Sequence, residues 1–481
     1  MSWQKKTAVF VRMLATVAIV LLLLDESASF SLLPPPGAML RPQISCNAPA
    51  GRIWPGKVGR GVGTALRNNI AYVAARRSGW TVGVALGAGA ITLDESKRQT
   101  EKIQRCRSVR ELAEFVTEYG GRFSHVNLNA AWMIMARLPP GDEDGVLAAA
   151  LQPLTRKLLG KMVARQVANT LHSTATLHTA GRPRAGAEVV QQLASRSLEV
   201  LRSTLKVPFD AQNIANTMWA LGKLDAKVSP ELAKVMQVRA IKIAPTFTGQ
   251  NVANLMWGLA TSGVEVDPEL AKAMQKRAIE IAPAFNEQQV ANLMWGLATL
   301  EVEVNLELSK AMQDRAIEIA PTFKSQGISN LMWGLATLGV VTAPELANVI
   351  QGQAIEIAPT FSAQNVANLM WALACFDTSY SPVSSLVAES MAVRLLSLRE
   401  QLSVKDKSQM NQWLLFCDLH PEWRGQLPMS MQKVKEELGG DFRQAFALEA
   451  PSPSRLQVGE SLVASLLFVG LAMILKTKSF N

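Results

Sequence analysis

A glutamine and an asparagine recur together five times, at a spacing that suits hydrogen-bonded recognition of a ligand. The asparagine follows the glutamine by four residues, so both side chains share one helix face, one turn apart. An amide donates and accepts hydrogen bonds, so a row of such pairs could contact the bases or phosphates of a nucleic acid. The pairs are Gln212 with Asn216, Gln250 with Asn254, Gln288 with Asn292, Gln326 with Asn330, and Gln364 with Asn368.

The same amides also have a structural interpretation, in which they bond to the backbone of a neighbouring unit at a close helix contact. We favour this interpretation for the asparagines and leave both open for the glutamines. A small residue beside each pair would leave room for something to approach: Ala220, Gly258, Gly296, Gly334 or Ala372. Because the units are so alike, units that each read one base would read the same base, which predicts a preference for a short homotypic run.

Arginines form a second recurring set, Arg239, Arg277 and Arg315, which could contact phosphate groups. Residues 209–378, however, contain 11 Lys and Arg against 16 Asp and Glu. A solvated face of mixed charge is therefore the alternative interpretation. We expect nucleic-acid affinity to depend more on the basic residues of 95–208, such as Lys97, Arg98 and Lys102.

Catalytic and metal chemistry find little support in the sequence. The four histidines have no metal-ligand spacing, and the four cysteines contain no CxxC pair. Neither a nucleophile elbow nor a phosphate-binding loop with its lysine is present. We expect no enzyme activity, no metal site and no cofactor.

The elements that carry the amides are repeats of 38 residues. Trp219, Trp257, Trp295, Trp333 and Trp371 are each 38 residues apart, and the stretch around them is nearly identical in every copy. A fixed period of this length indicates stacked helical units that share one continuous core. We predict an all-α fold, an α-α superhelix (solenoid) of helix-turn-helix repeats, with these tryptophans packed in the core between successive pairs.

Each unit carries start and stop signals for two helices. Asp210, Thr248, Asn286 and Ser362 are suitable N-caps for the first helix. Sequences such as "DPEL" place a cap, a proline and a glutamate at the start of the second helix. That helix is predicted to stop at a proline, for example Pro283.

The period and the core pattern of Phe, cap, Gln, Ala-Asn and Trp resemble the octotricopeptide-repeat class over residues 205–420. Related helical repeats occur in FAST-kinase-like and RNA-editing substrate-binding complex proteins. The resemblance implies an RNA-binding repeat protein acting in RNA processing, stability or translation in an organelle, with single-stranded organellar RNA and other RNA-processing proteins as partners. Such proteins often end in a RAP domain, of which 451–466 could be the first part.

The N-terminal region has the composition of a targeting leader. Residues 1–29 read as a signal peptide and 30–93 as a basic transit region with a second hydrophobic segment, 79–93. This order is similar to the bipartite leaders of dinoflagellate-type plastid proteins. We predict a secondary plastid, with the mitochondrion as the alternative.

The remaining boundaries follow from the repeats. Residues 94–208 are predicted to be degenerate repeats, with Trp132 in the place of the recurring tryptophan, and 209–440 the main array, whose last unit carries Trp413. A linker at 441–460 and a hydrophobic helix at 461–475, capable of weak membrane contact, would follow. The predicted function is RNA binding; the alternative is a protein-protein scaffold without direct RNA contact.

Overall fold

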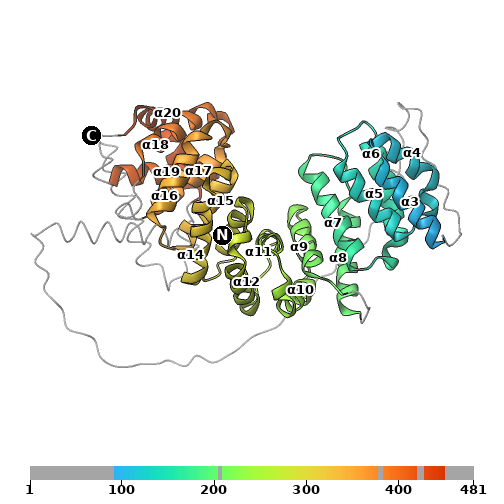
Figure 1. Ribbon diagram of the computed structural model, residues 1–481. Coiled ribbons are helices and arrows are strands. Elements are labelled where there is room, and N and C mark those ends of the chain that lie inside the picture. The colour runs from blue at the N-terminus through green and yellow to red at the C-terminus, as the bar shows by residue number, and fades with distance from the viewer. Residues whose placement is uncertain (1–91, 204–207, 377–382, 420–426, 450–481) are drawn as a thin grey trace, which may run out of the picture. The chain divides into compact units, whose positions relative to one another are not determined.

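The computed structural model describes residues 92–203, 208–376, 383–419 and 427–449. Within these ranges the chain forms 18 α-helices and no strand. The helices follow one another in sequence order as helix-turn-helix pairs (Figure 1). The fold is the predicted all-α solenoid.

The odd-numbered helices form one layer, in which each helix packs against the odd-numbered helices before and after it. Their bounds are α3 (Leu93–Arg105), α5 (His125–Arg137), α7 (Ala164–Thr179), α9 (Ala211–Lys223), α11 (Gly249–Thr261), α13 (Glu287–Thr299), α15 (Ser325–Leu338), α17 (Ala363–Cys375) and α19 (Val404–Leu419).

The even-numbered helices form the second layer and contact their own neighbours more sparsely. Their bounds are α4 (Val109–Tyr119), α6 (Asp144–Leu158), α8 (Ala187–Arg202), α10 (Pro230–Lys242), α12 (Pro268–Glu280), α14 (Leu306–Glu318), α16 (Pro344–Glu356), α18 (Ser385–Ser397) and α20 (Met429–Glu449).

Local capping defines where each helix starts. The side chains of Asp210, Thr248, Asn286 and Ser362 each accept a hydrogen bond from a backbone N–H of the first turn, as the sequence predicts. The even helices end slightly before the expected proline. In α12 the last helical residue is Glu280, and Pro283 lies in a 3₁₀ turn, Ala282–Ala284, that leads into the next unit.

A buried phenylalanine recurs once in each of these units. Phe209, Phe247, Phe285, Phe323 and Phe361 are all at most 1% exposed, and each lies directly before the N-cap of an odd helix. Leucine and methionine from both layers pack around them in one continuous core. The phenylalanine thus anchors the start of each unit between the two layers.

The small residues of the odd helices mark the closest helix contacts. A Cβ atom added to Gly258 would lie 2.5 Å from the carbonyl carbon of Met218, and one on Gly334 would lie 2.9 Å from that of Met294. We expected these small residues to leave room for a ligand, and this expectation is wrong. The space is filled by the backbone of the preceding odd helix.

One predicted boundary needs correction, and several predicted segments lie outside the described residues. Helix α20 continues to Glu449, past residue 441 where we placed the start of a linker, because Phe442 and Ala445 are buried. The signal peptide, the transit region up to residue 91 and the hydrophobic segment 461–475 lie outside the described residues. Among the residues described, no helix is long and apolar enough to span a membrane.

We predict that Gly258→Ala destabilises the protein by about 1–3 kcal/mol, since the added methyl group would overlap backbone atoms that cannot rotate away. Urea denaturation followed by circular dichroism measures the change. Gly352 of α16 is the matched control, because its added Cβ would meet nothing within 4 Å. Gly352→Ala should stabilise the helix by about 0.5–1 kcal/mol; equal effects of the two substitutions would contradict the close-contact assignment.

Candidate nucleic-acid interface

The ten recurring amides lie together on the outer side of the odd-helix layer; we call them the amide stripe. All five glutamines are exposed. Four of the asparagines are partly exposed, and Asn368 is buried with 7% of its surface accessible. The members of the amide stripe are Gln212, Asn216, Gln250, Asn254, Gln288, Asn292, Gln326, Asn330, Gln364 and Asn368.

The side chains of the amide stripe are not used to hold the fold together. In the part of the chain that the structure describes, none of them makes a hydrogen bond to another protein group, whereas the side chain of Gln289 on α13 accepts one from the backbone N–H of Asn286. The structural interpretation that we favoured for the asparagines, a bond to the neighbouring backbone, is therefore not what the structure shows. Four pairs of donors and acceptors and the exposed Gln364 remain accessible, whereas Asn368 is buried.

The recurring tryptophans flank the amide stripe in a continuous row, and their burial differs from our expectation. Trp333 and Trp371 are buried, whereas Trp219, Trp257 and Trp295 are partly exposed. Successive ring centroids from Trp257 to Trp371 are 6.1, 6.3 and 6.4 Å apart, with interplanar angles of 30 to 37°. These tilted contacts are typical of stabilising aromatic pairs. Packing between successive pairs is thus made by indole against indole at the edge of the core.

The degenerate units carry other residues at the indole position, and two of our assignments there are wrong. Counted from the N-cap Ser124, the counterpart of Trp219 is Met133, not Trp132. Trp132 is fully buried and its indole N–H donates to the Thr155 hydroxyl at 3.0 Å.

At the other end of the row, the counterpart is Gln412 rather than Trp413. Its side-chain oxygen accepts a 2.6 Å hydrogen bond from the indole N–H of Trp371, while Trp413 is buried. In α7 the position is held by His172, whose ring centroid is 4.9 Å from that of Trp219.

The recurring arginines have a structural role that the sequence did not reveal. The Nε atoms of Arg239, Arg277 and Arg315 donate to the carbonyl oxygens of Phe209, Phe247 and Phe285 at 2.8 to 2.9 Å. These are the carbonyls directly before the odd helix of the same unit. We therefore assign these arginines to the fold, in place of the phosphate contacts that we had considered.

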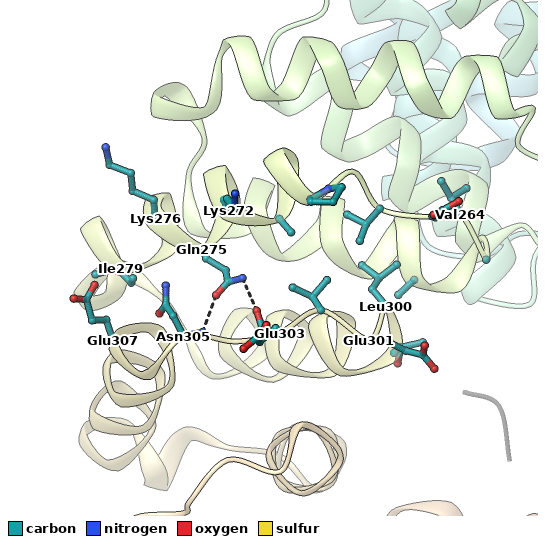
Figure 2. A pocket seen from close by; sticks show the side chains of 18 of the residues that line it. Val264, Lys272, Gln275, Lys276, Ile279, Leu300, Glu301, Glu303, Asn305 and Glu307 are labelled. Carbon is teal, nitrogen blue, oxygen red and sulfur yellow. Dashed lines mark hydrogen bonds between the residues drawn. The ribbon is translucent and has the colours of Figure 1, made fainter. Parts of the chain in front are cut away.

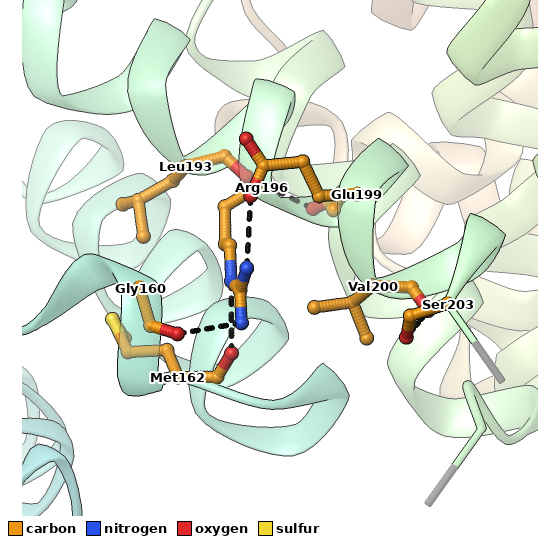
Figure 3. A network of polar contacts seen from close by, with 8 residues as sticks. Gly160, Met162, Leu193, Arg196, Glu199, Val200 and Ser203 are labelled. Carbon is orange, nitrogen blue, oxygen red and sulfur yellow. Dashed lines mark hydrogen bonds and ion pairs between the residues drawn. The ribbon is translucent and has the colours of Figure 1, made fainter. Parts of the chain in front are cut away.

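The arginine contact is also present in a degenerate unit (Figure 3). Arg196 donates from Nε to the carbonyl of Met162 at 3.1 Å and from a terminal nitrogen to that of Gly160 at 2.8 Å. It also pairs with Glu199 at 2.8 Å. Since Met162 precedes the N-cap of α7 as Phe209 precedes that of α9, the contact belongs to the repeat even where the phenylalanine is lost.

A second set of glutamines, on the even helices, makes hydrogen bonds from each unit to the backbone of the next unit. Gln275 donates to the carbonyl of Glu303 at 2.9 Å and accepts from the backbone N–H of Asn305 at 3.2 Å (Figure 2). Gln237 and Gln313 make the same pair of bonds one unit earlier and one unit later. We missed this contact, although the 38-residue spacing of these glutamines could have revealed it.

Positive charge is concentrated before the amide stripe. Lys97, Arg98, Lys102 and Arg105 of α3 are exposed, and so are Arg122, Lys161 and Arg165 at the starts of α5 and α7. Helices α11 and α17, by contrast, contain no charged residue, α13 contains only Glu287, and α15 has Lys324 at its N-cap. The surface therefore changes from cationic to nearly neutral along the array, which would separate phosphate attraction from base contact.

No metal or disulfide chemistry emerges from the described residues. They contain no group of three or more His, Cys, Asp or Glu side chains able to hold a metal ion. Cys106, Cys375 and Cys417 are free thiols, and burial raises the pKa of Cys375 and Cys417. A raised thiol pKa disfavours the reactive thiolate.

We predict that Arg277→Ala lowers stability by about 1.5–3 kcal/mol, because it removes a charge-assisted bond to the Phe247 carbonyl. Denaturation measures the loss, and nucleic-acid binding under native conditions should stay within twofold of the parent. Lys276→Ala, which removes an exposed cation one residue away, is the control and should leave stability nearly unchanged. A large loss of binding with unchanged stability would contradict the structural role.

The stability of the array should also depend on pH through His172. Burial lowers the pKa of His172 below its ordinary value of 6.5, so the unfolded chain binds a proton more readily than the folded one. Stability is then full above pH 6.5 and falls as the pH drops below it. We predict that His172→Phe, which keeps the ring contact with Trp219, loses less melting temperature between pH 7 and pH 5 than the parent. Equal losses in both proteins would exclude this role.

Comparison with known proteins follows the array. Residues 144–344 match the family model of the RNA-editing substrate-binding complex 6 protein. No curated protein matches the chain. A solved structure of an engineered protein from the Northeast Structural Genomics Consortium aligns with 14% identity over 76% of this chain and 97% of its own, with a TM-score of 0.23, which carries no argument about function. The chain is thus similar, from α6 to the start of α16, to a family of RNA-editing complex proteins.

Proposed function

We propose that this protein binds single-stranded RNA as part of an RNA-processing assembly. The observation that carries the proposal is the amide stripe, in which ten amide side chains recur on one face and none makes a hydrogen bond to another group of the described protein. These amides add no hydrogen bond to the fold, whereas single-stranded RNA offers base edges to them. The family match over 144–344, which includes most of the stripe, supports the same function.

The work of binding would be divided along the array. Exposed cations of α3, α5 and α7 attract the phosphate backbone, which gives affinity without sequence preference. The neutral stripe of α9 to α17 contacts the bases. The indoles support the stripe from beside it, since their rings are already in contact with each other.

We propose an organelle as the site of action. The support is the N-terminal segment of 93 residues, whose signal-like start and basic, acid-poor continuation suggest a secondary plastid. The mitochondrion is the alternative. A fusion of residues 1–93 to a fluorescent protein, expressed in an alga with a secondary plastid, would distinguish the two compartments.

A groove on the even-helix side favours a second candidate function, protein binding. A cavity of about 1130 Å³ lies between α12 and the segment that joins α13 to α14 (Figure 2). Its walls are apolar at Val264, Val266 and Val302. Its acidic side chains outnumber the two lysines, Lys272 and Lys276; they are Glu265, Glu280, Glu301, Glu303 and Glu307. A basic peptide segment fits this lining, and a scaffold could use the groove with or without RNA.

We predict that affinity for single-stranded RNA falls linearly with salt on a logarithmic scale, with a slope of about −0.7 for each phosphate contacted. Replacing Lys97, Arg98, Lys102 and Arg105 by alanine should make this slope shallower by about one to three units. Fluorescence anisotropy at several salt concentrations measures both.

The control for this experiment is the double variant Lys272→Ala with Lys276→Ala, which removes two exposed cations of the even layer. It should keep the parent slope. If no RNA is bound even at low salt, the proposed function is wrong and the scaffold takes its place.

A further inference from the structure

We propose that the amide stripe selects adenine, so that the preferred ligand is a single strand rich in consecutive adenosines. The inference rests on the proposed RNA binding and adds the identity of the base. It follows from three features of the stripe: its uniformity, the closure of the indole row, and the scarcity of cations beside the amides of α11 to α17, where Lys324 at the N-cap of α15 is the exception.

Uniformity means that neighbouring units present the same groups. Each of the five units offers one glutamine and one asparagine, one helical turn apart, with about 5–6 Å between their Cβ atoms. No unit from α9 to α17 replaces either amide by another residue type. A surface of this kind cannot read a mixed sequence, because every unit would hydrogen-bond best to the same base.

The indole row leaves no slot in which a base could stack. A base between two rings needs carbon contacts of about 3.5 Å on each of its faces, so the two rings must be about 7 Å apart or more. The rings of Trp257, Trp295, Trp333 and Trp371 have centroids only 6.1 to 6.4 Å apart. A base therefore meets the stripe with its edge, and hydrogen bonds decide which base binds.

Cations that would favour guanine are held elsewhere. Guanine is usually bound by an arginine or lysine on its N7 and O6 acceptors. Arg239, Arg277 and Arg315 donate to phenylalanine carbonyls, and Lys223 lies over the Trp257 ring with its Nζ 4.2 Å from the centroid. Among the N-caps of α11, α13, α15 and α17 only that of α15 is a cation, the exposed Lys324, so the amide pairs of the other three helices have no cationic N-cap beside them.

A primary amide forms two hydrogen bonds with an adjacent acceptor and donor, and adenine offers this pattern twice. Its N6 amino group has two hydrogens, flanked by the N7 acceptor on one side and the N1 acceptor on the other. A glutamine and an asparagine can thus each bind one side of the same adenine. Uracil has a single N3–H, and cytosine has an acceptor on only one side of its amino group. Adenine therefore makes more bonds to one Gln-Asn pair than either pyrimidine. Guanine can match this number through N1–H with O6 and N2–H with N3, but its usual partner is a cation on N7 and O6, whereas Asn and Gln usually bind adenine.

The test compares homopolymers on the full chain. Fluorescein-labelled oligoadenylate, oligouridylate and oligocytidylate, each long enough to span five units, are titrated at one salt concentration. We expect oligoadenylate to bind at least about tenfold more tightly than either pyrimidine strand. An oligomer of 7-deaza-adenosine, which lacks only the N7 acceptor, should lose most of that advantage.

A variant links the preference to the stripe. The triple change Gln250→Ala, Gln288→Ala and Gln326→Ala removes exposed side chains without hydrogen-bonding partners, so the melting temperature should not change. Its affinity for oligoadenylate should fall to the level of oligouridylate, and the salt slope should stay the same. Gln444→Ala, an exposed glutamine of α20, is the matched control and should behave as the parent.

Three results would overturn the inference. Equal affinity for all strands would exclude selection of adenine. Equal affinity for the adenosine and 7-deaza-adenosine strands would exclude recognition of the N6 and N7 edge. In both cases the proposed RNA binding would still hold. An adenine preference that survives in the triple variant would place the reader elsewhere. Absence of binding to every strand at low salt would overturn the proposed function together with the inference.

Discussion

The close approach of successive odd helices is the constraint on which the rest of the structure depends. At Gly258, Gly296 and Gly334 the backbone of one helix lies against the backbone of the helix before it, and an added Cβ would lie only 2.5 to 3.0 Å from the nearest backbone atom. This contact sets the distance between successive units. That distance in turn determines how the tryptophans and amides of neighbouring units are placed. The indoles are in ring contact because the helices are this close, and the amides fall into a row for the same reason.

The two layers have different tasks. In the even layer, recurring polar side chains bond to the backbone. Gln275 bonds to the segment between α13 and α14 of the next unit, and Arg277 donates to the Phe247 carbonyl before α11. In the odd layer the amides of the stripe make no hydrogen bond to the described protein. Buried backbone groups need partners, whereas exposed amides can stay with water until a ligand arrives. The division explains how a strongly repetitive protein keeps one surface free.

Much of the fold could be predicted from the sequence, because caps, prolines and the period act locally. Thr248 and Asn286 start helices where expected. We aligned Trp132 and Trp413 with the recurring tryptophan because of their residue type alone. The register of these helices is instead set by the N-caps Ser124 and Ser403. The regular spacing of an arginine in the sequence also does not distinguish an arginine that contacts phosphate from one that bonds to a backbone carbonyl. The arginines of the even layer could be assigned only from three-dimensional contacts, whereas the 38-residue spacing of the even-layer glutamines was visible in the sequence.

His172 and Gln412 flank the indole row, and the junctions in its middle offer matching contacts. A copied unit inserted among α11 to α15 would find the glycine, arginine and glutamine partners that it requires. Duplication and deletion of whole units could therefore lengthen or shorten such a chain in evolution without a new core having to arise. The terminal units, whose contacts differ, would be the ones that stay in place.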